Sequence, residues 1–108
     1  MYSLIITSLA AEDIFNTATY IADVLKAPAA ANNLLDEIER HEEILEHTPA
    51  IYPLVPDEYL AQGGMRFAII KNYLMFYVIN EDEKTVTVIR FLYGRRDWIH
   101  MLKTGPAG

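Results

Sequence analysis

The sequence predicts a single α+β domain in which a small antiparallel β-sheet is packed by an N-terminal helical hairpin. Three observations predict this class. Residues 65–93 hold three runs rich in aromatic and β-branched side chains, separated by tight turns, which is typical of neighbouring antiparallel strands. Residues 9–47 hold two long segments whose apolar side chains recur at helical spacing. A short apolar run at residues 2–7 adds a first strand, so the expected order is β-α-α-β-β-β-α.

The first helix is expected over residues 9–26. Ser8 is the expected N-cap, and the helix dipole favours Glu12 and Asp13 in the first turns. One stripe of this helix is apolar and is expected to be buried; it comprises Ala11, Ile14, Phe15, Ala18, Ile21, Ala22 and Leu25. Pro28 ends the helix and suits the first position of the next one, because its missing N–H is not needed there.

The second helix is expected over residues 28–47, and the short break before it favours an antiparallel helical hairpin. Its buried stripe is expected to comprise Leu34, Leu35, Ile38, His41 and Leu45. His41 and His47 flank a run of glutamates, but they are six residues apart, whereas ligands on one helix face need a spacing of three or four. We therefore expect no metal site here, and we expect His41 to lie at the margin of the core.

The second half of the chain is expected to begin with an irregular connection over residues 48–63, marked by three prolines. Three strands follow, at residues 65–70, 73–80 and 84–93. Lys71 and Asn72 fit a two-residue turn between the first two of them, because Asn tolerates a positive φ. Asp97 is expected to cap a short last helix over residues 98–102.

Length and composition suit one domain. The 108 residues are 52% apolar, so we expect one core within residues 1–103, followed by a flexible tail at residues 104–108. The chain has no cysteine, which excludes disulfides and thiolate metal sites and fits the cytoplasm. No apolar run reaches the roughly 20 residues that a membrane span needs, and the first residues lack the basic start of a signal peptide, so we expect no membrane association.

The basic side chains gather in the second half of the chain. Residues 1–62 hold 11 acidic and 2 basic side chains, whereas residues 63–108 hold 4 acidic and 7 basic ones. The net charge of −6 argues against nonspecific nucleic-acid binding. The uneven distribution nevertheless allows a local basic face in the second half.

The last of the three strands ends in a cluster of cations and a phenol. Regular alternation places Val86, Val88, Arg90 and Leu92 on one face and Thr87, Ile89, Phe91 and Tyr93 on the other. Gly94 then lets the backbone turn, and Arg95 and Arg96 follow at once. This pattern favours a surface that binds a negatively charged partner. The alternative is a solvated strand end whose charges keep the sheet edge soluble.

Four further residues complete the candidate surface: Arg66, Lys71, Trp98 and His100. Arg66 lies on a separate strand, from which it is able to face the same way as Arg90, and such cations suit phosphate or carboxylate groups. Trp98 either stacks on a ligand or anchors the last helix to the core. His100 is either an acid–base group near the basic face or a surface histidine. The sequence contains no glycine-rich phosphate loop and no serine–histidine–acid set.

The element order, the chain length and the segment RFAIIKNYLMFYVINEDEKTVTVIRFLYGRRDW resemble the RelE/ParE superfamily of type II toxin–antitoxin, or plasmid-stabilisation, toxins. The resemblance covers nearly the whole chain and is strongest in NYLMFYVI and VIRFLYGRRDW. It implies a small sheet packed by a helical hairpin, no metal and no small-molecule cofactor. It also implies one of two activities: the RelE branch cuts mRNA on the ribosome, and the ParE branch poisons DNA gyrase. In both branches a cognate antitoxin covers the basic surface of the toxin.

The resemblance also implies roles for individual residues. Arg96 matches the arginine of the family's last-strand motif, and Tyr93 lies near a catalytic aromatic residue or histidine of some members. As a ribonuclease, the chain would use Arg96 and Arg90 to stabilise the phosphate, Tyr93 as an acid–base or stacking group, and Arg66 to position the RNA. The remaining target contacts would come from Lys71, Arg95, Trp98 and His100.

The sequence departs from the ribonuclease pattern at two positions. Leu74 stands where ribonuclease members carry an arginine, and Leu102 falls near a late tyrosine that some members keep. The strong positive charge of those members is also missing. The leading interpretation at this point is a metal-free, ribosome-dependent mRNA endoribonuclease. Two alternatives stay open: a gyrase inhibitor that cuts nothing, and a remnant that only binds its antitoxin.

Overall fold

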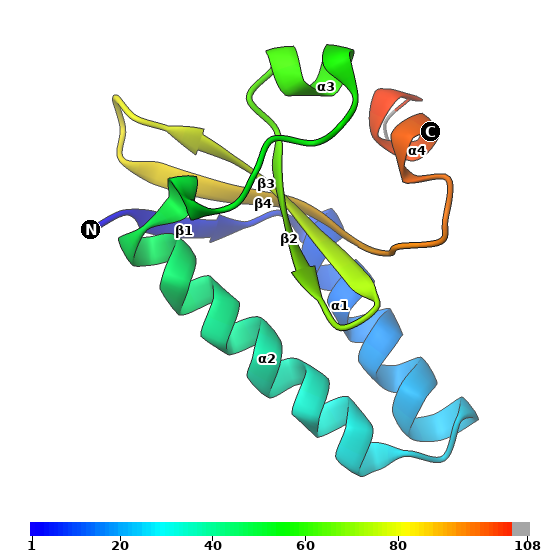
Figure 1. Cartoon of the computed structure of the whole chain (residues 1–108). Coiled ribbons are helices and arrows are strands. Elements are labelled where there is room, and N and C mark those ends of the chain that lie inside the picture. Colours follow the sequence, from blue (N-terminus) through cyan, green and yellow to red (C-terminus); the bar gives the residue numbers. More distant parts are fainter. Residues whose placement is uncertain (105–108) are drawn as a thin grey trace.

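A computed structural model describes residues 1–104 of the chain, and these residues form one sheet with helices on both of its faces (Figure 1). The four strands are β1 (Ser3–Ile6), β2 (Arg66–Ile70), β3 (Tyr73–Asn80) and β4 (Thr85–Tyr93). The four α-helices are α1 (Ser8–Thr19), α2 (Pro28–His47), α3 (Glu58–Gln62) and α4 (Trp98–Thr104). A π-helical turn (Tyr20–Val24) continues α1, and a 3₁₀ turn (Pro49–Ile51) follows α2. The predicted α+β class and the predicted order are confirmed, with α3 as an additional element.

The sheet has the strand order β1-β4-β3-β2. Strands β2, β3 and β4 form an antiparallel meander, as their tight turns predict. Strand β1 instead pairs with β4 in parallel, so the sheet is mixed rather than wholly antiparallel. The chain makes this parallel pairing possible because it leaves β1 through the helical hairpin, and parallel neighbours require such a long crossover.

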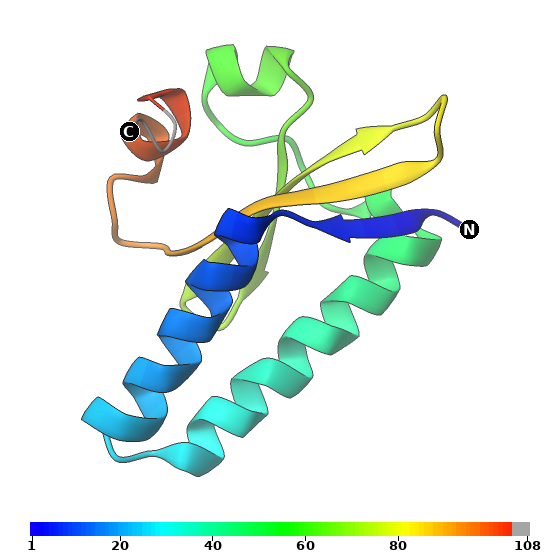
Figure 2. The same cartoon turned by 180° about the vertical axis from the view of Figure 1, so that it is seen from behind.

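The two faces of the sheet carry separate apolar clusters. The helical hairpin of α1 and α2 covers one face, where Leu34, Ile38, Met75, Tyr77 and Val88 are buried together (Figure 2). On the other face, α3 and α4 cover a smaller cluster that comprises Val55, Leu60, Leu74, Phe76 and Leu92. Sequence reasoning missed this second layer because it assigned α3 to an irregular connection. Asp57 caps α3 by accepting a hydrogen bond from the Leu60 N–H (3.0 Å), a local signal that was present in the sequence.

Helix α1 begins and turns differently from the prediction. Its N-cap is Thr7 rather than Ser8, because the Thr7 hydroxyl oxygen accepts a hydrogen bond from the Ala10 N–H (3.1 Å). The predicted buried stripe is confirmed at Ile14 and Ile21, which pack against the core, but Phe15 is 69% exposed, and Ala10, outside the predicted stripe, is fully buried. The side chains of Thr7 and Asp13 bond to β4, and we infer that these polar contacts fix the rotation of the helix on the sheet.

Helix α2 matches its predicted bounds and most of its predicted stripe. Leu34, Ile38 and Leu45 are buried, whereas Leu35 lies 37% exposed at the side. His41 is half-buried at the margin of the core, as predicted, and its Nδ1 donates a hydrogen bond to the Glu37 carbonyl (2.8 Å). Its ring stacks on that of Tyr52 at a centroid distance of 5.9 Å.

A bulge in β4 overturns the predicted alternation of that strand. Phe76 of β3 pairs with Arg90, but the next residue, Tyr77, pairs with Val88, so Ile89 is an extra residue. The side chains of β4 therefore change face at this point. Val88 and Phe91 join the cluster under the helical hairpin although they are three residues apart, and Leu92 joins the opposite cluster.

The remaining local predictions hold with small changes. Ile70 pairs with Tyr73, which confirms the two-residue turn, but the positive φ (56°) lies at Lys71 rather than at Asn72. The last helix extends to Thr104, which the prediction placed in the flexible tail, and the other residues of that predicted tail, 105–108, lie outside the described residues. Over residues 1–104, none of the helices combines the length and the apolar character that a membrane crossing requires.

Candidate functional site

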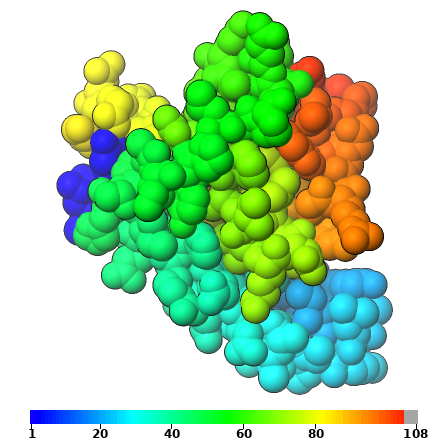
Figure 3. Space-filling model, in the orientation of Figure 1, coloured from blue at the N-terminus to red at the C-terminus, as the bar shows by residue number. Residues whose placement is uncertain are grey.

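The end of β4 meets the turn between β2 and β3, and we call the residues around this junction the strand-end site: Lys71, Asn72, Tyr93, Gly94, Arg95 and Arg96. The Gly94 N–H donates a hydrogen bond to the Asn72 carbonyl (2.8 Å), which extends the pairing of the strands by one step. A Cβ atom at Gly94 would lie only 3.2 Å from that carbonyl oxygen, so the absence of a side chain permits this approach. In Figure 3 the turn and the end of β4 lie beside each other on the surface.

The cations of the strand-end site point into solvent. Lys71, Arg95 and Arg96 are exposed, and within residues 1–104 none of them forms an ion pair. The Arg96 N–H donates to the Tyr93 carbonyl (3.0 Å), which closes a turn and directs the chain toward α4. A shallow cleft of about 300 Å³ opens here; its lining includes Lys71, Tyr93 and Arg95.

Aromatic packing beneath the strand-end site supports Tyr93. The Tyr73 ring stacks on the buried Phe91 ring at a centroid distance of 5.2 Å and meets the Tyr93 ring edge-on at 5.6 Å. Burial raises the pKa of Tyr73, and the neighbouring phenols of Tyr93 and Tyr20 raise it further. The Tyr93 side chain itself is 39% exposed, so one edge of this aromatic group is open to a partner.

Arg90 does not reach the strand-end site, because Asp13 of α1 holds it. The Arg90 Nε and the second guanidinium nitrogen, Nη2, donate to the two Asp13 carboxylate oxygens at 2.7 and 3.0 Å. Both side chains are largely buried, at 12% and 13% exposed. The hydrogen bond to Asp13 raises the pKa of the Arg90 guanidinium. The expectation that Arg90 offers its charge to a ligand is therefore corrected: its bidentate donor pair is occupied within the fold.

Arg66 is the first residue of β2 and lies at the end of that strand away from the strand-end site. It pairs with Tyr77, whereas Tyr93 pairs with Tyr73, and four residues of strand span about 13 Å. Its Nη1 donates to the Tyr52 carbonyl (2.6 Å), so the side chain holds the connection that follows α2. Arg66 and Arg90 oppose Tyr77 and Phe76, neighbouring residues of β3 that lie on opposite faces, so the possibility that the two arginines share a face is not realised.

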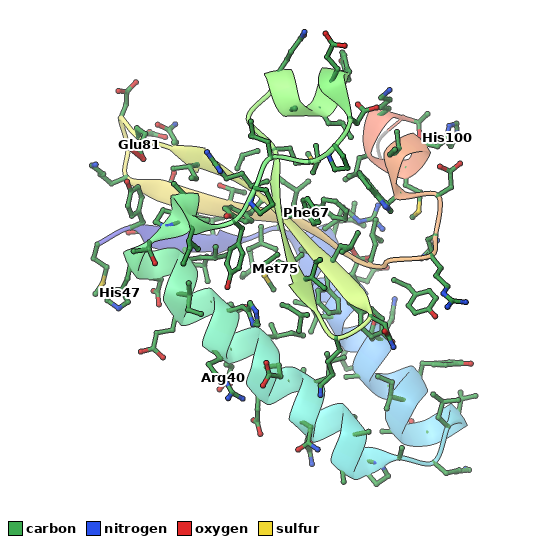
Figure 4. All side chains as sticks on the ribbon, in the orientation of Figure 1. Arg40, His47, Phe67, Met75, Glu81 and His100 are labelled. Carbon is green, nitrogen blue, oxygen red and sulfur yellow. The ribbon has the colours of Figure 1, made fainter. Side chains whose placement is uncertain are left out.

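The two predicted residues of α4 differ in their surroundings. The Trp98 ring packs against the Phe76 ring at a centroid distance of 5.1 Å, so it anchors α4 to the sheet, the second of its two expected roles. His100 is exposed on the outer side of α4 (Figure 4). Its backbone N–H faces the Asp97 carboxylate at 3.4 Å, and this contact helps to cap the helix.

The structure thus joins part of the predicted set and separates the rest. Lys71, Tyr93, Arg95 and Arg96 come together, whereas Arg66 and Arg90 serve the fold elsewhere. Sequence reasoning missed Asn72 as a backbone partner of the site, and it explained Asp13 by the helix dipole alone. Within residues 1–104, His, Cys, Asp and Glu side chains form no group of three that is able to hold a metal ion.

The arrangement has the chemistry of an anion-binding surface. Guanidinium groups bind carboxylates and phosphates through two parallel hydrogen bonds, and an exposed aromatic edge adds apolar contact. Among the described residues, the Tyr93 hydroxyl has no hydrogen-bond partner that would act as a proton acceptor or donor. The site is therefore equipped to bind an anionic surface.

Comparisons with known proteins agree with the fold. A family model described as the ParE toxin of the type II toxin–antitoxin system parDE matches residues 4–98. A search of curated proteins found no match. Among solved structures, the chromosomal ParDE system of P. aeruginosa aligns at 20% identity with a TM-score of 0.68, covering 86% of this chain and 96% of that one.

A second solved structure, a RelBE toxin–antitoxin complex from Mycobacterium tuberculosis, aligns at 15% identity with a TM-score of 0.56. The alignment covers 85% of this chain and 96% of that one. At these identities the two structures support the fold, whereas the family model spans most of the sequence. The chain belongs to the ParE toxin family of type II toxin–antitoxin systems.

Proposed function

We propose that this toxin acts by binding DNA gyrase through the strand-end site and that it does not cut RNA. The proposal rests on one contrast within the site. Lys71, Arg95 and Arg96 are exposed and free of ion pairs among the described residues, whereas Arg90, which would have to support a phosphate, is bonded to Asp13. Such a surface is suited to docking on a protein with exposed carboxylates.

Metal-free cleavage of RNA would require several groups to act together at this site. Attack by a ribose 2′-hydroxyl needs a base, an acid and donors that stabilise the charged phosphate. Tyr93 is the only titratable group of the cleft besides its cations, and Leu74, beneath it, contributes a methyl surface where ribonuclease members carry an arginine. His100 is exposed on α4 and lies outside the residues that line the cleft.

One observation supports the ribonuclease hypothesis. The cleft is lined by Lys71, Tyr93 and Arg95 together, and an RNA phosphate bound there would need such neighbouring donors. This hypothesis therefore remains the second candidate, and the test of function includes it directly.

The antitoxin is the other partner in this proposal. We infer that it covers the strand-end site, because the exposed cations there offer the strongest attraction for an acidic segment. Its affinity would fall as salt rises, since exposed charges are screened within about 10 Å at 0.1 M salt.

The test compares two assays on the purified toxin. In a supercoiling assay with purified gyrase, we expect the wild type to inhibit the enzyme. Arg96→Ala should inhibit at least about tenfold more weakly, because it loses one charged contact with the target. Arg40→Ala is the matched control, because Arg40 is an exposed arginine on α2 that pairs only with Glu37 (2.7 Å).

The second assay is cell-free translation followed by mapping of mRNA ends. We expect intact mRNA at toxin concentrations that stop gyrase. Cleavage within coding frames, together with normal supercoiling, would replace this proposal by the ribonuclease one.

A further inference from the structure

Strand β1 is too short to cover the edge of β4. Its pairing ends where Ile6 meets Val88, yet β4 continues to Tyr93. The backbone groups of β4 beyond Val88 on this side therefore have no neighbouring strand. The bulge at Ile89 lies in this same segment, and beyond it β3 holds β4 along one edge only, while the other edge has no strand.

The start of α1 takes the place of the missing strand. The Thr7 N–H donates to the Val88 carbonyl (3.2 Å), and the Thr7 hydroxyl donates to the Ile89 carbonyl (3.1 Å). Asp13 Oδ2 then accepts a hydrogen bond from the Phe91 N–H (3.1 Å). The side chains of Thr7, the N-cap of α1, and of Asp13 thus form hydrogen bonds with the β4 backbone on both sides of Arg90.

One carboxylate holds both the backbone and a side chain of β4. Asp13 accepts the Phe91 N–H and two hydrogen bonds from Arg90, so three donors from adjacent residues converge on it. The Asp13 side chain is only 13% exposed, which shields these bonds from competing water. The sequence indicated only that Asp13 interacts favourably with the helix dipole, and such a role would require none of these contacts.

The contacts of Asp13 lead directly to the strand-end site. Phe91, whose N–H Asp13 accepts, stacks on Tyr73, and Tyr73 meets Tyr93 edge-on. Tyr93 is the last residue of β4, and its carbonyl accepts the Arg96 N–H. We propose that Asp13 is a positioning residue of the strand-end site: it fixes the course of β4 after the bulge and thereby the orientation of Tyr93, Arg95 and Arg96.

The activity arm of this inference rests on the proposed function, so its test has a second arm that needs no target. In ¹⁵N-labelled toxin, hydrogen exchange at the Phe91 amide and the amide signals of residues 93–96 report the geometry directly. Asp13→Ala removes all three acceptor contacts. Asp13→Asn keeps an oxygen that accepts the Phe91 N–H but loses the charge that attracts Arg90.

We expect Asp13→Ala to exchange its Phe91 amide at least about tenfold faster and to shift the signals of residues 93–96. Gyrase inhibition by the folded fraction should weaken by about tenfold, because a misdirected strand end loses about one charged contact. Asp13→Asn should recover most of both losses. Glu12→Gln is the control: it removes a negative charge that also acts on Arg90 from the same turn, and it should behave as the wild type.

Three results would overturn the inference. The first is a folded Asp13→Ala protein whose signals at residues 93–96 and whose inhibition match the wild type. The second is an Asp13→Asn protein no better than Asp13→Ala. The third concerns an Asp13→Ala protein that does not fold: Asp13→Asn then decides, and wild-type signals at residues 93–96 in that variant, despite a Phe91 amide that exchanges at least about tenfold faster, would contradict the role. A wild type that leaves gyrase unaffected would refute the proposed function alone, since the exchange and signal measurements still decide the role of Asp13.

Discussion

The four arginines of β2, β4 and the segment after β4 fall into two groups that differ in what surrounds them. Arg66 and Arg90 lie within strands, and the fold uses their donors: Arg66 holds a backbone carbonyl and Arg90 holds a carboxylate. Arg95 and Arg96 follow the last paired residue of β4 and remain exposed. In this protein, the guanidinium groups within paired strands form hydrogen bonds inside the fold. The guanidinium groups that follow the last paired residue stay exposed to a partner.

The largest expected effect separates the two groups by stability. Arg90→Ala leaves the largely buried Asp13 carboxylate without its cation, which should lower the free energy of unfolding by about 3 kcal/mol. Urea unfolding followed by circular dichroism measures this loss. Arg40→Ala removes an exposed arginine and should cost less than about 0.5 kcal/mol. Equal losses in the two variants would show that the Asp13–Arg90 pair has no special weight.

A smaller effect is expected where Arg66 and Tyr77 hold the connection after α2. The buried Tyr77 hydroxyl donates to the Pro49 carbonyl, so Tyr77→Phe should cost about 1 kcal/mol at neutral pH. Burial raises the pKa of Tyr77 to about 12, above its ordinary value of 10.0. The unfolded chain therefore loses this proton first, and stability should fall as pH rises from 10 toward 12.

The control for this prediction is the same alkaline titration of Tyr77→Phe, in which that contribution disappears. An unchanged pH dependence above 10 in the variant would mean that Tyr77 ionises as readily in the folded protein as in the unfolded chain.

The smallest effect is expected at the exposed ion pair that joins α3 and α4. Lys103 Nζ lies 3.0 Å from Asp57 Oδ1, and the lysine is 40% exposed, so Lys103→Ala should change Tm by less than about 2 °C. The Leu60 N–H and Lys103 lower the pKa of Asp57, so its contribution is present at neutral pH and is lost as pH falls through that lowered value. A shift comparable with that of Arg90→Ala would mean that α4 depends on this pair.

Sequence reasoning succeeded where structure is determined locally. The bounds of α2 and the meander of β2, β3 and β4 follow from apolar periodicity and short turns, and the structure reproduces them. The run from Tyr93 to Arg96 was recognised because its residues are adjacent in the chain. Lys71 joins them through the hairpin turn, which the sequence also indicated.

The failures arise from contacts between distant residues. Asp13 and Arg90 are 77 residues apart, and no local pattern shows that a helix side chain will cap the edge of a strand. The bulge at Ile89 reverses the faces of the residues after it, since strand alternation has a period of two. We infer the same origin for the exposed Phe15, because the side chains of Thr7 and Asp13 bond to the distant strand β4.

The central claim is that the exposed arginines of the strand-end site bind the target and contribute nothing to the fold. The most direct measurement is the gyrase inhibition and the Tm of the double variant Arg95→Ala/Arg96→Ala in one preparation, beside the wild type. We expect a Tm within about 2 °C of the wild type, because exposed substitutions change stability little, together with inhibition weakened by about a hundredfold for two lost charged contacts. Wild-type inhibition at an unchanged Tm would contradict the claim.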